Sequence, residues 1–206
     1  GHEKLQELFL DTGYSRAKIS VSMKNLAAFD VIEKVVSFET GGWENAKKGV
    51  YRISNPHINF YFNFIYPNLS DLFILSPQEF YDKYIAKTLD DYLSRYFSLV
   101  CREYLTLLNK MGQLPIKLTN IGTWVGKEST IDVVGQSTDR QTVVGICNYA
   151  EKEMHYSAYE ELVASAAKAK VNPKATYLFS ATAFDLSLKA LASRDNSVIL
   201  VDMTEL

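Results

Sequence analysis

The chain has few cysteines and no long apolar run, and each scarcity argues against a class of protein. Its 206 residues include only two cysteines, Cys101 and Cys147. These are too few for a disulfide framework and have no partner at metal-ligand spacing. We therefore expect two reduced thiols in apolar surroundings, which weakly favours a cytoplasmic protein. No run of about 18 apolar residues occurs, so neither a membrane span nor a membrane partner is expected.

Neither sign of charge dominates: 22 basic and 24 acidic residues give a net charge of −2. This total does not indicate a strongly basic nucleic-acid protein, although a local basic patch is compatible with it. Hydrophobic residues make up 47% of the chain, which is close to the globular average. The chain lacks an initiating Met and a helical pattern begins almost at once, so we expect a piece of a longer protein.

Motifs for common enzyme chemistries are also scarce. The segment Gly122–Lys127 has three residues rather than four between its glycines, and Glu128 stands where a phosphate loop needs Ser or Thr. None of the three histidines lies near a Gly-x-Ser-x-Gly elbow, a motif that the chain lacks. ATP hydrolysis, serine hydrolysis and zinc binding by these residues are therefore not expected.

The N-terminal part has the order helix, turn, helix, hairpin. Apolar residues at helical spacing predict a helix over residues 3–10, and Ser15 is a good N-cap for a second helix that reaches about Ala28. Strands are expected at residues 31–38 and 50–53, with a polar turn between them. This order predicts a winged helix-turn-helix over residues 1–66, with its usual first helix truncated.

The second helix and the hairpin of this segment hold the residues that would contact DNA. In a DNA-binding winged helix the second helix lies in the major groove, where basic and amide side chains reach bases and phosphates. The candidates are Arg16, Lys18, Lys24, Asn25, Lys47 and Lys48. The net charge of residues 1–66 is only +1, which is weak for a tight nucleic-acid binder. A role in protein contact is therefore weighed somewhat above binding of duplex DNA.

A dense aromatic run occupies residues 59–66. Its side chains are those of Phe60, Tyr61, Phe62, Phe64 and Tyr66. Because aromatic side chains are usually buried, we interpret the run as a buried connector. A platform on which nucleic-acid bases stack is the less favoured interpretation.

The remainder, residues 67–206, is expected to form the second domain. Ser76 to Glu79 reads as a capped helix start, and a long helix is expected at 89–109 with an apolar stripe. The stripe consists of Leu93, Phe97, Val100, Cys101, Tyr104 and Leu108. Strands are expected at residues 117–122, 130–135, 142–149, 175–180 and 197–202, and further helices at 158–170 and 184–192. This order predicts an α/β domain with a mixed sheet flanked by helices.

Short motifs along the chain resemble the C-terminal region of archaeal-type prokaryotic AAA (P-loop) ATPases. The matching segments are Val50–Pro56, Phe64–Asn68, Cys101–Leu105, Ile121–Trp124, Ile131–Val134, Tyr177–Ser180 and Val201–Asp202. In that family an ATPase module precedes a winged helix and a restriction-endonuclease-like domain of unknown function. The resemblance therefore implies this fold for the second domain and an ATPase module as a partner within the longer protein.

Domains of this type are related to the PD-(D/E)XK nucleases, which hold Mg²⁺ between an Asp on one strand and a Glu on the next. A Lys two residues after the Glu faces the same side of its strand. The resemblance aligns Asp132 with the Asp but Ile146 with the Glu and Asn148 with the Lys, and Ser98 replaces a further Glu on the long helix. A single carboxylate holds Mg²⁺ poorly. We therefore expect a vestigial site without metal or cofactor; the alternative is a migrated site with Mg²⁺ between Asp132 and Glu128.

Three hypotheses about function follow. The leading hypothesis is a non-catalytic C-terminal region of a prokaryotic AAA-type ATPase that binds nucleic acid or a partner protein. The second is a metal-dependent nuclease with a migrated active site, and the third is a pure protein-assembly module. The candidate partners are duplex DNA, the ATPase module of the longer protein and a second copy of the chain.

Overall fold

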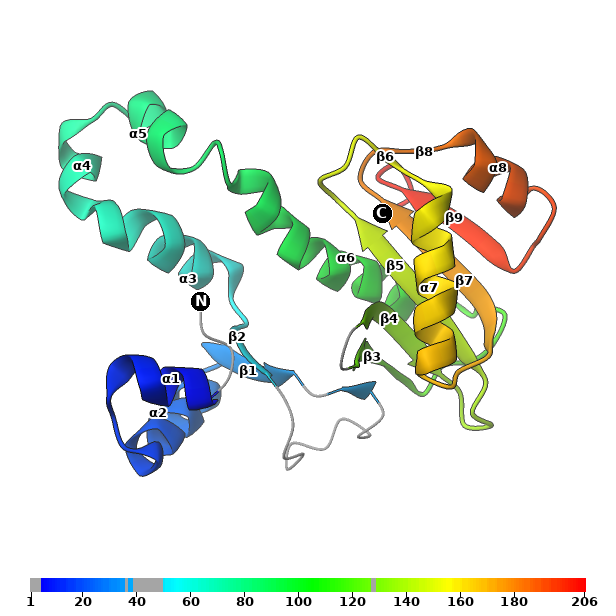
Figure 1. The fold of residues 1–206 in the computed structure, drawn as a ribbon, viewed down its shortest axis with the longest axis horizontal. Helices are drawn as coiled ribbons and strands as arrows, with labels where there is room; N and C mark the ends of the chain where they lie inside the picture. The colour runs from blue at the N-terminus through cyan, green and yellow to red at the C-terminus, as the bar shows by residue number, and fades with distance from the viewer. Residues whose placement is uncertain (1–4, 36, 39–49, 127–128) are drawn as a thin grey trace. The chain divides into compact units, whose positions relative to one another are not determined.

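The computed structural model describes residues 5–35, 37–38, 50–126 and 129–206 (Figure 1). The chain divides into two compact units. The first consists of Gly1–Val36 and Gly42–Leu89, and the second of Ser37–Gly41 and Asp90–Leu206. Residues 67–89, which the sequence analysis grouped with the second domain, therefore cluster with the N-terminal part of the chain.

The first unit begins with the expected order of helix, turn, helix and hairpin. Its elements are α1 (Leu5–Thr12), α2 (Arg16–Ala28), β1 (Ile32–Val35) and β2 (Val50–Ile53), and the two strands pair antiparallel. Ser15 caps α2, because its hydroxyl accepts a hydrogen bond from the Lys18 N–H at 3.3 Å. The polar turn between the strands, predicted at residues 39–49, lies outside the described residues.

A run of short helices completes the first unit. These are α3 (Pro56–Phe60), the π-helical turn η2 (Tyr61–Ile65), the 3-10 turn η3 (Tyr66–Asn68), α4 (Leu69–Ile74) and α5 (Pro77–Tyr84). The predicted start of α5 is confirmed as a capping box. The Glu79 N–H donates to the Ser76 hydroxyl at 3.3 Å, and the Ser76 N–H donates to the Glu79 carboxylate at 2.9 Å.

The expectation that the aromatic run would be buried is wrong for most of its members. Phe64 is buried, whereas Tyr61, Phe62 and Tyr66 are exposed. The run is helical, so Phe60 and Phe64, four residues apart, share one face, with ring centroids 4.9 Å apart. A helix of this length directs only one of its faces into a core, and the remaining rings point to solvent.

The second unit is built on a five-stranded mixed sheet with the order β3-β4-β5-β7-β9. Its strands are β3 (Asn120–Val125), β4 (Thr130–Gln136), β5 (Thr142–Asn148), β7 (Pro173–Ser180) and β9 (Val198–Asp202). The pairs β3–β4 and β4–β5 are antiparallel, and the pairs β5–β7 and β7–β9 are parallel. The mixed sheet expected from the sequence is therefore confirmed.

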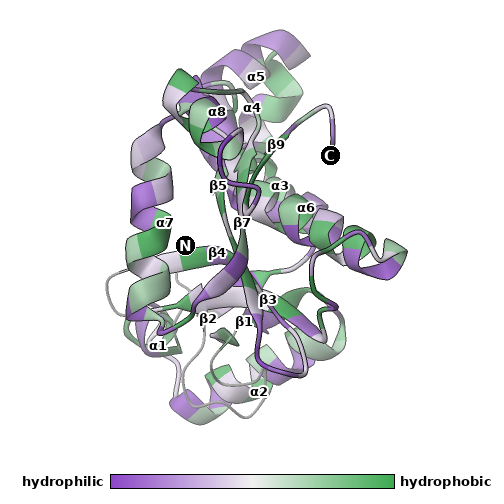
Figure 2. Cartoon of the chain, turned by 90° about the vertical axis from the view of Figure 1, so that its right-hand side faces the viewer, coloured by the Kyte–Doolittle hydropathy of each residue, from purple (hydrophilic) through white to green (hydrophobic). Residues whose placement is uncertain are grey.

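Helices cover both faces of this sheet. The long helix α6 (Leu89–Met111) lies on one face, and α7 (Tyr156–Lys168) and α8 (Leu186–Ala192) lie on the other (Figure 1). Strands β5 and β7 are largely hydrophobic along their length (Figure 2), as strands buried on both faces must be. The two-residue strands β6 (Glu153–Met154) and β8 (Ala183–Phe184) pair in parallel and escaped prediction. No helix among the described residues is long and apolar enough to cross a membrane.

The edge strand β3 is covered in part by the segment that follows β1. The backbone N–H of Val125 donates to the Ser37 hydroxyl at 3.1 Å, and Phe38 packs against the core on the α7 side of the sheet. An edge strand presents unpaired backbone groups that would otherwise be open to pairing with another chain. Ser37 and Phe38 thus belong structurally to the second unit.

The apolar stripe of α6 is close to the prediction but rotated. Phe97 and Cys101 are buried as expected, whereas Val100 is 44% exposed and the unpredicted Leu105 is fully buried. Phe97, Cys101 and Leu105 are spaced by four residues and so form one row on the helix surface. Val100 lies outside that row and is not among the residues packed against the core.

This rotation predicts different costs for two truncations on the same helix. Leu105→Ala removes a fully buried side chain and should lower the free energy of unfolding by about 2–5 kcal/mol. Val100→Ala should change it by no more than about 0.5 kcal/mol, because the side chain already contacts solvent. Urea unfolding followed by circular dichroism measures both. Equal costs would contradict the orientation of α6.

Candidate functional site

Asp132 lies in a β-bulge near the start of β4. Gly122 pairs with Val134 and Trp124 pairs with Ile131, so Asp132 and Val133 together stand opposite the single residue Thr123. The Thr123 hydroxyl donates to the backbone carbonyl of Asp132 at 3.0 Å, which satisfies a group that the bulge removes from the ladder. Bulges redirect a side chain locally. Here the bulge turns the Asp132 carboxylate towards β5.

Strands β4 and β5 separate at this point. Their pairing ends at Val133 and Gly145, and beyond it residues 146–148 of β5 pair only with β7. The N–H of Cys147 would be left without a strand partner, but it donates to the Asp132 carboxylate at 2.9 Å. Asp132 therefore bridges the two strands where their backbones diverge.

The electrostatic environment of Asp132 does not resemble that of a paired carboxylate. Burial raises the pKa of its carboxyl, and the negative charge of Glu161 on α7 raises it further. The hydrogen bond from Cys147 and the positive charge of Arg102 on α6 act in the opposite direction and only offset part of the effect. The ionised form is thus disfavoured by the fold.

The two positions aligned with the lost Glu and Lys have structural contacts of their own. Ile146 packs against the apolar core on the α7 side. The Asn148 side-chain oxygen accepts from the Glu151 N–H at 3.2 Å, and its amide nitrogen lies 3.5 Å from the Glu151 carbonyl and from the Ser180 hydroxyl. Asn148 therefore closes the loop after β5. Ser98, the replacement on the long helix, is half-buried on α6.

A second carboxylate near Asp132 comes from a helix that the sequence analysis did not consider. Glu161 is exposed on α7, and its charge acts on Asp132. The only sequence signal is an acidic residue in the helix that follows β5. Glu128, the partner proposed for a migrated site, lies outside the described residues. Among residues 5–35, 37–38, 50–126 and 129–206, no group of three or more His, Cys, Asp or Glu could hold a metal ion.

The segment that superficially resembled a phosphate loop is mostly strand. Gly122 to Val125 form the last four residues of β3, and the Trp124 side chain is buried in the core. A Cβ atom on Gly126 would come within 2.3 Å of the Trp124 ring. Gly122 to Gly126 therefore pack at the edge of the sheet, and Lys127 and Glu128 lie outside the described residues.

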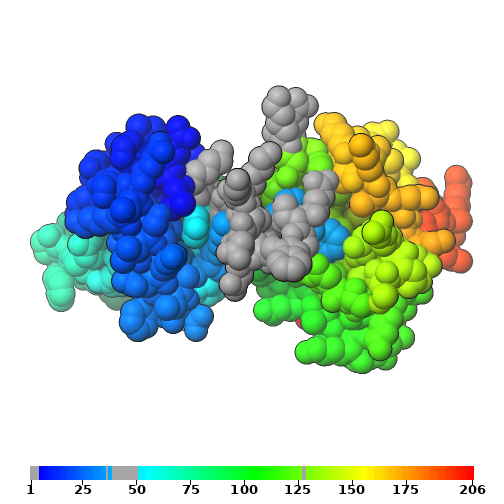
Figure 3. Space-filling view, turned by 90° about the horizontal axis from the view of Figure 1, so that it is seen from below, coloured from blue at the N-terminus to red at the C-terminus, as the bar shows by residue number. Residues whose placement is uncertain are grey.

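The predicted DNA-contacting side chains of α2 are all exposed. Arg16, Lys18, Lys24 and Asn25 face solvent, and the surface of α1 and α2, in dark blue, is open in the space-filling view (Figure 3). The 13 residues of α2 include three basic and no acidic side chains. The Lys18 ammonium lies 3.6 Å from the Tyr14 ring centroid, which orients it without removing its charge. Lys47 and Lys48 lie outside the described residues.

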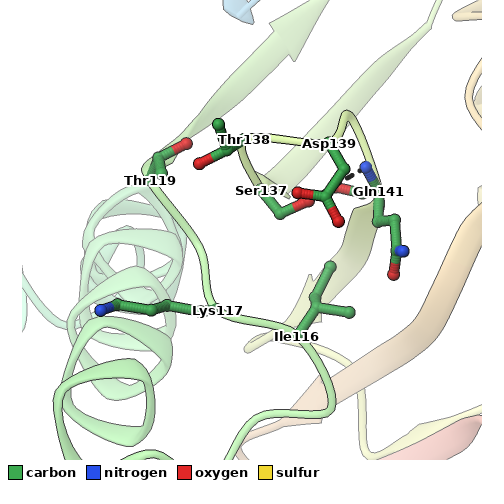
Figure 4. A pocket seen from close by; sticks show the side chains of 7 residues that line it. All are labelled: Ile116, Lys117, Thr119, Ser137, Thr138, Asp139 and Gln141. Carbon is green, nitrogen blue, oxygen red and sulfur yellow. Dashed lines mark hydrogen bonds between the residues drawn. The ribbon is translucent and has the colours of Figure 1, made fainter.

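A polar pocket lies at the opposite end of β4 and β5 from Asp132. It has a volume of about 460 Å³ and is lined by residues of the β4–β5 turn and of the loop before β3 (Figure 4). The lining residues are Ile116, Lys117, Thr119, Ser137, Thr138, Asp139 and Gln141. The Ser137 hydroxyl accepts from the Gln141 N–H at 3.1 Å, so part of the polar lining serves to close the turn.

The fold and this site define an α/β protein with a mixed five-stranded sheet and a partly buried aspartate where two strands diverge. The chain belongs to the DUF234 family, described as archaea bacterial proteins of unknown function, whose family model matches residues 61–168. An uncharacterized protein of Methanocaldococcus jannaschii is 32% identical over 135 residues, which cover 65% of this chain and 29% of the relative. The chain thus spans less than a third of that relative.

Among solved structures, a repair endonuclease from Pyrococcus abyssi is similar with a TM-score of 0.32 and 11% identity. The match covers 50% of this chain and 46% of that chain. A similarity of this size supports no inference about activity.

The raised pKa of Asp132 predicts that its charge costs stability at neutral pH. A carboxyl whose pKa is raised by folding stabilises the fold at low pH, and that contribution is lost as the pH rises through the folded pKa. Asp132→Asn keeps an oxygen for the Cys147 N–H and removes the charge. We expect this variant to melt higher than the wild type at pH 7, because the charge that burial disfavours is absent. The difference should vanish below pH 3.8, the ordinary pKa of Asp.

Asp132→Ala is the matched control, because it also removes the acceptor. Leaving the Cys147 N–H unsatisfied should cost about 1–3 kcal/mol at any pH. Thermal melts of the three proteins between pH 3 and pH 8 measure both effects. An Asn variant that melts below the wild type at pH 7 would contradict the prediction that the charge of Asp132 costs stability.

Proposed function

We propose that this chain is a non-catalytic binding module, in which a nuclease-like domain has lost its metal site and the helix-turn-helix segment contacts duplex DNA. One observation supports the loss of the metal site. At the place where β4 and β5 diverge, β5 offers Ile146 in the core and Asn148 in a closed loop. Neither side chain supplies the carboxylate or the ammonium that metal-dependent phosphodiester hydrolysis needs.

The order of the strands supports the relation to nucleases. In the second unit a helix is followed by three antiparallel strands, a crossover helix and a strand parallel to the last of the three. This is the core arrangement expected from the resemblance to restriction-endonuclease-like domains. Asp132 lies at the divergence of the second and third of these strands, which is where such nucleases hold their metal.

The charge and exposure of α2 support the DNA half of the proposal. It is the second helix of a helix-turn-helix, it is followed by a two-stranded hairpin, and its only charged residues are basic. A helix of this type fits the major groove, where lysine and arginine contact phosphates and bases. Under this proposal any ATP hydrolysis belongs to an AAA-type module outside these residues.

The loss of the metal site can be tested by restoring it. The double substitution Ile146→Glu and Asn148→Lys returns the missing carboxylate and ammonium to β5. We expect the wild type to show no saturable Mn²⁺ binding at millimolar concentrations, and the double variant to bind at least about tenfold tighter, a gain of about 1.4 kcal/mol. Isothermal titration calorimetry measures the binding, and circular dichroism checks that the variant is folded.

Adding Asp132→Ala to the double variant should abolish the gain, because a metal held by one carboxylate is held weakly. Cleavage of plasmid DNA by the wild type in Mg²⁺ or Mn²⁺, lost in Asp132→Ala, would overturn the proposal. The alternative function is a metal-dependent nuclease with a migrated ligand. The effect of the Glu161 charge on Asp132 favours Glu161 as that ligand. In that case Glu161→Gln would abolish wild-type cleavage as well.

DNA binding through α2 predicts a characteristic response to salt. Retardation of a short duplex should weaken as salt rises, because each neutralised phosphate releases a counterion. Changing Arg16 and Lys18 together to Ala should reduce the slope of log K against log salt concentration by about 1.8, since each phosphate contact contributes about 0.9. Fluorescence anisotropy of a labelled duplex at several salt concentrations gives the slope.

The matched control removes two exposed positive charges elsewhere. The Lys168→Ala, Lys189→Ala double variant should leave the slope unchanged, because these residues lie on α7 and α8. Equal decreases of the slope in both double variants would refute the assignment of DNA binding to α2.

The exposed rings of Tyr61, Phe62 and Tyr66 favour the protein-assembly alternative. Self-association without retardation of DNA would support that function instead.

A further inference from the structure

The two edges of the five-stranded sheet differ in how they are protected. At one edge, β3 carries a bulge and is covered in part by Ser37 and Phe38. At the other edge, no strand among the residues that the structure describes pairs with the outer side of β9 (Figure 1). The residues of β9 include no lysine or proline, and their pairing with β7 has no bulge. β9 thus lacks the features that usually keep an edge strand from pairing with another chain.

The backbone groups of β9 alternate between its inner and outer sides. The carbonyl of Ser197 accepts a hydrogen bond from the Thr176 N–H of β7 at 2.7 Å. In a parallel pair, residues that bond to the neighbouring strand alternate with residues whose N–H and C=O groups point the other way. The register therefore makes the odd-numbered residues of β9 bond to β7. The residues that point to the outer edge are Val198, Leu200 and Asp202.

The chain itself bonds only some of the outward groups. The Val198 N–H donates to the Asp195 carbonyl at 3.0 Å, and the Asp202 carbonyl accepts from the Glu205 N–H at 3.1 Å. Within the described part of the chain, no hydrogen bond reaches the Val198 carbonyl, the Asp202 N–H or either backbone group of Leu200. The outer edge therefore offers two donors and two acceptors.

These four groups match those of a second copy related by a two-fold axis at Leu200. In an antiparallel pair, opposite residues exchange both of their hydrogen bonds at every second position. With Leu200 opposite Leu200 of the second copy, each N–H meets the carbonyl of the other. Each Asp202 N–H then meets the Val198 carbonyl of the other copy. The groups that this register leaves idle are those that the chain already bonds internally.

The side chains of β9 suit the same register. Leu200 packs against the core on the α7 side of the sheet and Ile199 on the α6 side, and both remain partly exposed. Ile199 lies opposite Val201 of the second copy. Asp202 lies opposite Val198, so no like charges face each other across the pair. Pairing would therefore extend both apolar layers across the two copies.

We propose that two copies of this chain associate through β9, which pairs antiparallel with β9 of the second copy around Leu200. Four backbone hydrogen bonds and the partly exposed side chains of Leu200 and Ile199 form the centre of the interface. The five-stranded sheets of the two copies become one continuous sheet. The interface uses neither α2 nor Asp132, so its test does not depend on the proposed function.

Sedimentation equilibrium of the full chain measures the association. One strand from each copy makes a small interface, so we expect a Kd of roughly 10–100 µM. Leu200→Lys and Leu200→Glu should each weaken the dimer at least about tenfold, because like charges then lie directly opposite each other. An equimolar mixture of the two variants should associate at least about tenfold more tightly than either alone. Damage to the fold cannot produce this recovery.

Val163→Lys is the matched control, because Val163 is exposed on α7, which packs on β4 and β5. It should associate as the wild type does. A wild type that stays monomeric at about 500 µM would overturn the proposal. So would charge variants of Leu200 that dimerise like the wild type, or folded variants whose mixture fails to associate.

Hydrogen exchange of the wild type decides the question even if a variant fails to fold. The Leu200 and Asp202 amides should exchange rapidly in dilute protein and become protected as the concentration rises through the Kd. The Ile199 amide, which bonds to β7, should be protected at every concentration. Rates for Leu200 and Asp202 that do not change with concentration would contradict pairing at this edge.

Discussion

Strand β5 lies at the centre of the five-stranded sheet, and the second unit depends on how its backbone is paired beyond Gly145. Both of its faces are buried under helices, so it needs apolar side chains throughout. Beyond Gly145 it no longer pairs with β4, and residues 146–148 are half-buried. A buried N–H without an acceptor is costly. The Asp132 carboxylate supplies that acceptor for Cys147. The bulge in β4 directs the carboxylate towards β5.

The same constraint explains why a strand junction of this kind can accommodate a metal site and which side chains such a site would need. Where two strands separate, side chains from both can converge on a point that backbone hydrogen bonds no longer fill. A second carboxylate would make that point attractive to a cation. In this chain Ile146 fills the space with hydrocarbon, and Asn148 is engaged in closing the loop that leads towards β6. Asp132 is left with a backbone donor and a charge that the fold disfavours.

Prediction from the sequence was accurate where the structure depends on residues close together in the chain, and less accurate where it depends on distant ones. The helix caps at Ser15 and Ser76 were predictable from the sequence, because a cap is formed within three residues of the chain. The five strands of the main sheet were also predictable, since apolar runs bounded by turns have few alternative structures. The burial of the aromatic run was misjudged because the usual burial of aromatic side chains says nothing of the helical structure that exposes one of its faces. The burial of Val100 was misjudged because the apolar pattern of a helix does not fix its rotation against a sheet. Glu161 was missed because its proximity to Asp132 depends on how α7 crosses β4 and β5.

By itself the sequence determined the class of the fold, the order of its elements, and the absence of a carboxylate and an ammonium at two positions of β5. Those properties are local or compositional, and no packing can create a side chain that the chain lacks. Only the tertiary structure decided what surrounds Asp132: the hydrogen bond from the Cys147 N–H and the charge of Glu161 on α7. Each of these joins residues distant in sequence, and their geometry follows from how helices settle on a twisted sheet.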